Sequence, residues 1–259
     1  MNLRKNILNL YFHSLKKISF VLKTENCLCC ESVTNLLPLC KNCQEKILTI
    51  NKTLSRCSIC GKFLVSEDEL CTECRENPVI NSLDKVYPMY SYRLWNKEIL
   101  FKWKLQGYRN FAYLFSKKIL EIYTEEFSDF VIVPVPPRPN KIKKQGWDQI
   151  DDLIKFIKLQ SNIKVMNLLK RTESIQQKKL NREQRLAHKG SVFILDKRFE
   201  NKELPKKVLI IDDILTTGIT LENCALALKN AGVETVSAIT VFIADWLFRN
   251  VQIFHVFDT

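Results

Sequence analysis

An apolar strand pattern that ends in two acids and a hydroxyl-rich turn constrains this chain more than any other stretch. Residues 207–220 read KVLIIDDILTTGIT, and a helical pattern follows over residues 221–230. Gly232 is placed to end that helix, and residues 236–243 form the next apolar run. A strand, a turn, a helix and another strand in this order predict one unit of a doubly wound α/β domain with a mostly parallel sheet.

A second unit of the same kind lies upstream. Residues 130–135 (FVIVPV) predict a buried strand, a proline-rich turn and a basic loop follow, and residues 149–158 predict a helix. Residues 87–92 predict a further strand, followed by one or two helices whose expected core residues are Ile99, Leu100, Trp103, Leu114, Phe115 and Leu120. The aromatic residues there interleave with lysines and could instead stack on nucleobases, but we favour a role in the core.

The turn after the two acids has the chemistry of an anion site. The start of a helix presents unpaired backbone N–H groups, and small or hydroxylated residues let a phosphate approach closely. Asp212 and Asp213 can accept hydrogen bonds from vicinal hydroxyls or position a hydrated magnesium ion. Neither G-x-x-x-x-G-K-[ST] nor G-x-G-x-x-G occurs in the chain. We therefore expect a ribose 5-phosphate group, with its phosphate held by Thr216, Thr217, Gly218 and Thr220.

Eight cysteines form four C-x-x-C pairs in the first third of the chain, namely Cys27/Cys30, Cys40/Cys43, Cys57/Cys60 and Cys71/Cys74. Two such pairs can supply four thiolates to a tetrahedral zinc ion. Because no secretion signal is recognisable, disulfides are the less favoured interpretation, and we expect one or two structural zinc ions. The spacing leaves sequential and interleaved combinations of pairs both open, and Cys29 could replace a neighbour or be spare.

With these motifs in place, the chain resembles a known family. The two acids followed by TTG-x-T are similar to the phosphoribosyl-pyrophosphate (PRPP) motif of type I phosphoribosyltransferases. Together with the cysteine pairs, VPVPPRP followed by QGWDQ and a Q-x-x-L…R stretch at 177–185 resemble the ComF/GntX family. These competence-associated proteins combine a double zinc ribbon with a phosphoribosyltransferase-like domain, and the resemblance covers most of residues 20–243.

The resemblance implies a type I phosphoribosyltransferase-like α/β fold with a small N-terminal zinc-ribbon module. Asp212 and Asp213 would bind the ribose hydroxyls of PRPP, residues 216–220 its 5-phosphate, and magnesium would accompany the pyrophosphate. Arg138, in the loop after residues 130–135, and Arg185 would contribute further ligand contacts. Gln145 and Asp148 stand where the family usually has Arg and Asn, and His188 stands where Asn is common. The missing arginine at position 145 weakens the expected contact with pyrophosphate.

Composition and charge complete the expected organisation. We expect an N-terminal amphipathic helix over 1–26, a double zinc-ribbon module over 27–78 and the phosphoribosyltransferase-like domain over 79–259. Lys and Arg number 40 against 28 Asp and Glu, a net charge of +12 that suits a polyanionic partner. No apolar run approaches the roughly 18 residues that a membrane span needs. We expect a cytoplasmic protein, with a peripheral location at the inner face of the membrane as the alternative.

Two functions remain open from the sequence. The resemblance implies handling of incoming single-stranded DNA during natural transformation, with PRPP bound and with a DNA-uptake channel or a helicase as a possible partner. The alternative is an active phosphoribosyltransferase that uses PRPP and magnesium on an unidentified base or nucleic-acid acceptor. No segment is recognisable as a hood that covers a nucleobase, and the zinc module stands where a hood is expected.

Overall fold

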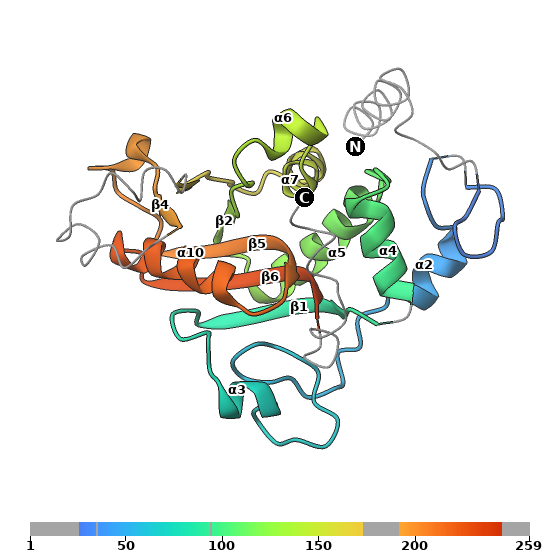
Figure 1. Cartoon of the computed structure of the whole chain (residues 1–259), viewed down its shortest axis with the longest axis horizontal. Coiled ribbons are helices and arrows are strands. Elements are labelled where there is room, and N and C mark those ends of the chain that lie inside the picture. The colour runs from blue at the N-terminus through green and yellow to red at the C-terminus, as the bar shows by residue number, and fades with distance from the viewer. Residues whose placement is uncertain (1–25, 35, 94, 173–191, 245–259) are drawn as a thin grey trace.

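A four-stranded parallel sheet forms the centre of the computed structural model (Figure 1), which describes residues 26–34, 36–93, 95–172 and 192–244. The strand order is β1-β6-β5-β2. The strands are β1 (Lys85–Ser91), β2 (Val131–Pro134), β5 (Lys207–Leu215) and β6 (Thr235–Ile243). A separate antiparallel pair joins β3 (Leu169–Arg171) to β4 (Phe193–Leu195). The predicted parallel sheet is confirmed, and the predicted N-terminal helix lies outside the described residues apart from residue 26.

Helices cover both faces of the sheet, as a doubly wound fold requires. One face carries α4 (Trp95–Lys104), α5 (Phe111–Glu126) and α7 (Gln149–Gln160), and the other carries α10 (Ile219–Asn230). Side chains alternate along β5, so Leu209 and Ile211 pack with the first group while Val208 and Ile210 pack with α10. Two short helices lie in connections: α6 (Lys141–Gln145) and the 3₁₀ helix η1 (Lys197–Phe199). None of the helices in the described ranges is long and apolar enough to cross a bilayer.

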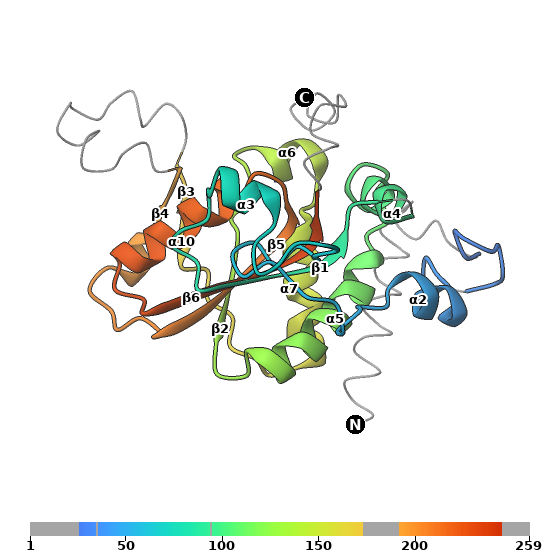
Figure 2. The same cartoon turned by 90° about the horizontal axis from the view of Figure 1, so that it is seen from below.

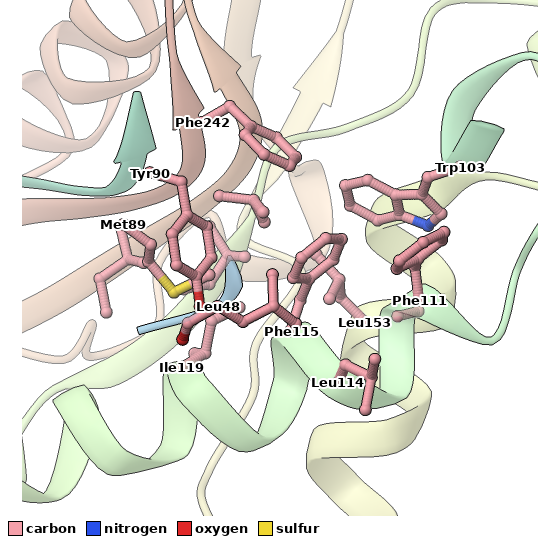
Figure 3. Close-up of a cluster of buried hydrophobic side chains, with 14 of the residues drawn as sticks. Leu48, Met89, Tyr90, Trp103, Phe111, Leu114, Phe115, Ile119, Leu153 and Phe242 are labelled. Atoms are coloured by element: carbon pink, nitrogen blue, oxygen red, sulfur yellow. Dashed lines mark hydrogen bonds between the residues drawn. The ribbon is translucent and has the colours of Figure 1, made fainter. Parts of the chain in front are cut away.

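The core beneath α4 and α5 is rich in aromatic side chains (Figure 3). The Phe115 ring lies 4.9 Å from Trp103 and 5.6 Å from Phe242, measured between ring centroids. The predicted core residues of this region are buried, except that Leu120 is half-buried. Burying one such side chain stabilises a fold by about 2 kcal/mol, so this cluster is a large part of what holds α4 and α5 on the sheet.

The segment before β1 forms two small modules, which we call the first cysteine module (residues 26–48) and the second cysteine module (residues 55–77). They contain the short helices α2 (Lys41–Ile47) and α3 (Thr72–Glu76). The first module packs into the core of α4 and α5, where the Tyr90 hydroxyl donates to the Leu48 carbonyl oxygen at 3.1 Å. Figure 3 shows Leu48 among the side chains of that core.

The second cysteine module packs into the other core, with α10. Cys57, Cys60 and Cys71 share that core with Val86 of β1 and with the α10-facing side chains of β5. Figures 1 and 2 both show the second module beside β1. The two modules therefore join different cores, and each is buried against the sheet and its helices. The domain boundaries at 26/27 and 78/79 stay a prediction.

Candidate functional site

The two adjacent acids lie near the carboxyl end of β5. The strand continues through Asp212 and Asp213 to Leu215, so the acids belong to the strand and the turn begins only after it. Gly218 adopts a left-handed conformation (φ 85°, ψ −14°), and α10 starts at the next residue. A side chain with a Cβ atom rarely adopts this φ, which explains the glycine. Thr220 lies in the first turn of α10, and the predicted strand, turn and helix are confirmed.

Both acids are buried, and their environments differ. Asp213 forms an ion pair with Lys104, with 2.8 Å between Oδ2 and Nζ. Burial raises the pKa of Asp212 to about 7, and the neighbouring charge of Asp213 adds to this effect. The backbone N–H of Asp213 donates to Asp212 Oδ1 at 2.8 Å and acts in the opposite direction. Near neutral pH, Asp212 can therefore exchange a proton. Asp213 differs in having the Lys104 ammonium as an ion-pair partner.

Lys104 is a site residue that the sequence did not reveal. It is the last residue of α4, and its backbone carbonyl oxygen accepts hydrogen bonds from Gln145 Nε2 at 2.9 Å and Gln149 Nε2 at 3.2 Å. These bonds join the end of α4 to the connection that follows β2. The lysine ammonium thus reaches Asp213 from a helix end that is hydrogen-bonded to the connection after β2.

Gln145 and Asp148, which replace residues usual in the resembled family, both have structural roles. The Gln145 side chain donates to the Lys104 carbonyl oxygen and so helps to fix the end of α4. Asp148 is the N-cap of α7, since its carboxylate accepts from the backbone N–H groups of Ile150 and Asp151. The Lys141 ammonium lies 2.6 Å from the same carboxylate. The connection after β2 is therefore ordered by its own side chains, with Arg138 exposed on it.

Arg171 of β3 is a second residue that the sequence did not reveal. Burial and the positive charge of Arg138 lower the pKa of Arg171, and the negative charge of Asp212 opposes this. Arg171 is therefore within electrostatic reach of both Arg138 and Asp212, which brings positive charge from β3 near the acids of β5. The predicted contact Arg185 lies outside the described residues, as does His188.

A cavity of about 790 Å³ opens beside the turn. The turn side contributes Thr216, Thr217 and Gly218, and the ends of neighbouring strands contribute Leu215 and Ile243. The opposite side comes from the second cysteine module. Asp212 and Asp213 do not line this cavity, so the two halves of the motif face different surroundings. The cavity has the size of a small-molecule site and is far larger than a phosphate alone requires.

The eight paired cysteines form two sets of four. Cys27, Cys30, Cys40 and Cys43 make up one set, and Cys57, Cys60, Cys71 and Cys74 the other, with the Sγ atoms of each set within 4.8 Å of one another. The open question of combination is thereby answered in favour of sequential pairs, and Cys29 belongs to neither set.

The sulfur distances suit a metal ion. Cys30 and Cys40 Sγ lie 3.6 Å apart, and Cys60 and Cys71 Sγ lie 3.7 Å apart. A tetrahedral site with Zn–S bonds of about 2.3 Å has sulfur–sulfur edges of about 3.8 Å, whereas a disulfide needs about 2.05 Å. Both sets could therefore hold zinc as closed S₄ sites. A closed site has no open position for a substrate, so its role would be structural.

The chain is similar to a known domain family and to two competence proteins. Residues 165–250 match the phosphoribosyl transferase domain. The chain is 23% identical to competence protein ComFC of Streptococcus pneumoniae over 224 residues, which are 84% of this chain and 88% of that protein. It is also 26% identical to competence protein F of Haemophilus influenzae over 212 residues, covering 76% of this chain and 87% of that protein.

Proposed function

Because this chain belongs to the ComF family of competence-associated proteins, we propose that it binds PRPP or a related phosphoribosyl ligand and handles single-stranded DNA during natural transformation. The observation that supports a phosphoribosyl ligand is the order of acids, turn and helix start at the end of β5. Two buried acids precede a left-handed glycine turn that opens a helix and borders a cavity. The acids suit ribose hydroxyls, and the turn suits a phosphate. A ligand that bears both groups explains why the two features are adjacent.

In this proposal, Asp212 and Asp213 accept hydrogen bonds from the ribose hydroxyls. The ligand hydroxyls share Asp213 with Lys104 or displace its ammonium, because both would use the same carboxylate. Residues 216–220 hold the 5-phosphate through backbone N–H groups and hydroxyls. Arg138 and Arg171 face the more anionic part of the ligand, where magnesium would neutralise a pyrophosphate.

The DNA part of the proposal rests on charge and aromatic side chains. The net charge is +12. We define the basic–aromatic surface as Lys102, Tyr108, Lys143, Lys144 and Trp147. Its two rings are each near a cation: the Lys102 ammonium lies 5.6 Å from the Tyr108 ring and the Arg109 guanidinium 5.4 Å from the Trp147 ring. Half-buried rings beside exposed lysines suit the stacked bases and phosphates of a single strand.

The two cysteine sets would hold structural zinc, one ion in each. The metal would neutralise thiolates that otherwise crowd each other. Without a metal, the hydrogen bond that the Cys60 thiol donates to Cys74, together with burial, raises the pKa of Cys60, so this thiol resists ionisation. Hydrogen bonds from Ser32 lower the pKa of Cys30 to about 6. Zinc would make all four sulfurs of a set equivalent ligands and supply much of the folding free energy of its module.

The test is isothermal calorimetry of PRPP with magnesium, with and without short single-stranded DNA. We expect saturable binding of PRPP that is lost when Asp212 and Asp213 are both changed to Asn, while two zinc ions per chain are retained. A double variant that binds PRPP as well as the wild type would contradict the assigned acids. Failure of the wild type to bind DNA at low salt would contradict the DNA part alone.

A second function is favoured by the size of the cavity. An active phosphoribosyltransferase needs room for an acceptor next to the phosphoribosyl group, and about 790 Å³ borders the turn. Release of pyrophosphate from PRPP that depends on an added base or DNA end would establish this alternative. Release that is equally slow with and without each acceptor would exclude it for the acceptors used.

A further inference from the structure

The two cysteine sets lie in different surroundings. Cys57, Cys60 and Cys71 of the second set are buried in the core that also contains β5 and the inner face of α10. In the first set, the buried cysteines pack in the core of α4 and α5, and Cys30 is exposed. Of the two sets, the second is therefore the one that shares a core with the helix whose start we assign to a phosphate.

The first half of the second cysteine module is anchored on β1. Arg56, directly before the first cysteine of the set, donates from Nη1 to the Gly61 carbonyl oxygen at 3.0 Å and to the Pro88 carbonyl oxygen at 2.8 Å. Gly61, directly after the second cysteine, approaches β1 so closely that a Cβ there would lie 2.1 Å from the Val86 carbonyl oxygen. This half of the module therefore has a fixed place on the sheet.

The other half of the module leads to the turn before α10. Cys71 stands at the start of α3 and Cys74 within it, and residues 77–82, which we call the connecting segment, follow the helix. A Cβ at Gly218 of the turn would lie 2.8 Å from Ile80 Cγ1. Ile80 is 7% exposed. The connecting segment is therefore packed against the turn.

The connecting segment is also bonded to α10 itself. Glu222 lies in the first turn of α10, and its carboxylate accepts hydrogen bonds from the backbone N–H groups of Asn81 at 2.9 Å and Ser82 at 3.0 Å. The Ser82 hydroxyl donates to the same carboxylate at 2.7 Å. Glu222 is buried, so water competes little for these bonds. One short segment thus contacts the turn and fixes itself on the helix that the turn opens.

The order of the turn matters for phosphate binding. A phosphate at a helix start is held by several backbone N–H groups that must point to one place. A turn that has to become ordered when the ligand binds loses affinity, whereas a turn already held by its neighbours does not. The helix α3 is too short to be stable by itself, so its position would depend on a metal bound by the second set.

Resting on the proposed phosphate site, we propose that metal binding at the second cysteine set raises the affinity of the turn for phosphate through the connecting segment, and that the first set has no such effect. The four thiols would join α3 to the half of the module that is anchored on β1, which places Ile80 against Gly218. Coupling between two binding sites is reciprocal. A phosphate ligand at the turn therefore raises the affinity of the second set for metal by the same factor.

Three substitutions separate the connecting segment from the rest of the protein. Ile80→Ala removes the side chain that packs on Gly218, and Ile80→Val keeps most of it. The matched variant Ile47→Ala shortens an isoleucine at the end of α2 in the first cysteine module, which packs on the other core. None of these changes removes a cysteine, so zinc content and circular dichroism can verify that all three variants are folded.

The first measurement is the affinity for ribose 5-phosphate, by calorimetry with zinc in excess. We expect the wild type, Ile80→Val and Ile47→Ala to bind alike and Ile80→Ala to bind about tenfold more weakly, within the range typical of coupled sites. Equal affinities of Ile80→Ala and the wild type would overturn the role of the connecting segment. If the wild type does not bind ribose 5-phosphate at all, the proposed phosphoribosyl site is contradicted, and the coupling with it.

The second measurement concerns the metal. The full chain is equilibrated at graded concentrations of free zinc set by a chelator, iodoacetamide then alkylates the cysteines that hold no metal, and peptide mass spectrometry assigns them to a set. Ribose 5-phosphate should lower the free zinc at which the second set fills by about the same tenfold factor and leave the first set unchanged. In Ile80→Ala this shift should disappear. A shift in both sets, in neither set, or undiminished in Ile80→Ala would overturn the coupling and leave the phosphoribosyl site standing.

Discussion

Asp212 and Asp213 stand side by side in a buried strand, where each charge opposes the other. Stability alone would favour an apolar residue at Asp212, since the position is buried and follows Val208 and Ile210 in the alternation toward the core of α10. The acid is retained at an energetic cost, which is common where side chains serve a ligand. Lys104 compensates Asp213 directly, and Asp212 takes up a proton instead.

This cost predicts a pH effect. An aspartate in an unfolded chain ionises near pH 4, and burial raises the pKa of Asp212 to about 7 in the folded protein. Between these values the folded state binds more protons, so stability falls as pH rises through this window. Asp212→Asn should remove this pH-dependent loss of stability, because asparagine does not ionise. We expect the variant to exceed the wild type at pH 8 by on the order of 1–3 kcal/mol and to match it near pH 4, measured by urea unfolding.

Asp196 provides a control of opposite sign. Hydrogen bonds from Arg198 lower the pKa of Asp196 to about 2. The stability that ionised Asp196 contributes to the folded protein is therefore present above pH 4 and is lost as pH falls toward 2. Asp196→Asn should be less stable than the wild type at pH 8, and the difference should shrink on acidification. A loss of stability at pH 8 in both variants would show that Asp212 is not an unfavourable charge.

The motif residues could be predicted from sequence, and their charged partners could not. Asp212, Asp213 and residues 216–220 form one local pattern, because a strand, a turn and a helix start are adjacent in the chain. Lys104 lies close in sequence to Lys97 and Lys102, and nothing local distinguishes it. It reaches Asp213 only because α4 packs back on the sheet. Arg171 likewise acquires its neighbours from tertiary structure.

Among the elements, α5 and α7 are joined by one buried ion pair. Arg109, just before α5, donates from Nε and Nη2 to both carboxylate oxygens of Asp152 in α7 at 2.6 and 2.7 Å. The carboxylate is 3% exposed, so the pair is shielded from water. The pair also orients α7, whose first residues hold the connection that supports Lys104.

Arg109→Met should leave that carboxylate buried without its main partner. We expect a loss of about 3–5 kcal/mol in the free energy of unfolding, measured in urea at pH 7. The double variant Arg109→Met with Asp152→Asn should recover a large part of the loss, because the uncompensated charge is removed. If the double variant is as unstable as the single one, packing of the arginine stem is the cause.

Most elements were predictable because their patterns are long and regular. The strands β1, β2, β5 and β6 and the helices α7 and α10 all lie where apolar periodicity placed them. The combination of cysteine pairs was not predictable, because the gaps between successive pairs are similar. Only the fold of each module brings four sulfurs together.

At the scale of the whole molecule, the lysines of α6 test where DNA binds. Changing both Lys143 and Lys144 to Ala should weaken single-strand binding and lower the slope of log affinity against log salt by up to about 1.4, since each lost phosphate contact is worth about 0.7. The matched variant changes Lys202 and Lys206, two exposed lysines near the opposite end of β5, to Ala. Fluorescence anisotropy with a labelled oligonucleotide measures both.

The matched variant removes the same net charge, so only location differs. Equal losses in the two variants would mean that DNA responds to overall charge and not to the basic–aromatic surface. The position of a DNA-binding surface could not be predicted from the sequence, because the sequence gives the net charge but not which side chains share a surface. The same holds for the two cysteine modules: they are neighbours in the chain, and only the completed sheet separates them onto different cores.

The position of β1 has a consequence for biosynthesis. Among the described residues, its neighbour in the four-stranded sheet is β6, which begins only at Thr235. A ribosome releases both cysteine modules and β1 long before β6 emerges, and until then the cores that bury them are incomplete. The nascent thiols are therefore open to oxidants and to competing metals throughout most of synthesis. Lasting capture of zinc would coincide with completion of the four-stranded sheet, so the pairing of β6 with β1 would be the step that secures the zinc-bound form.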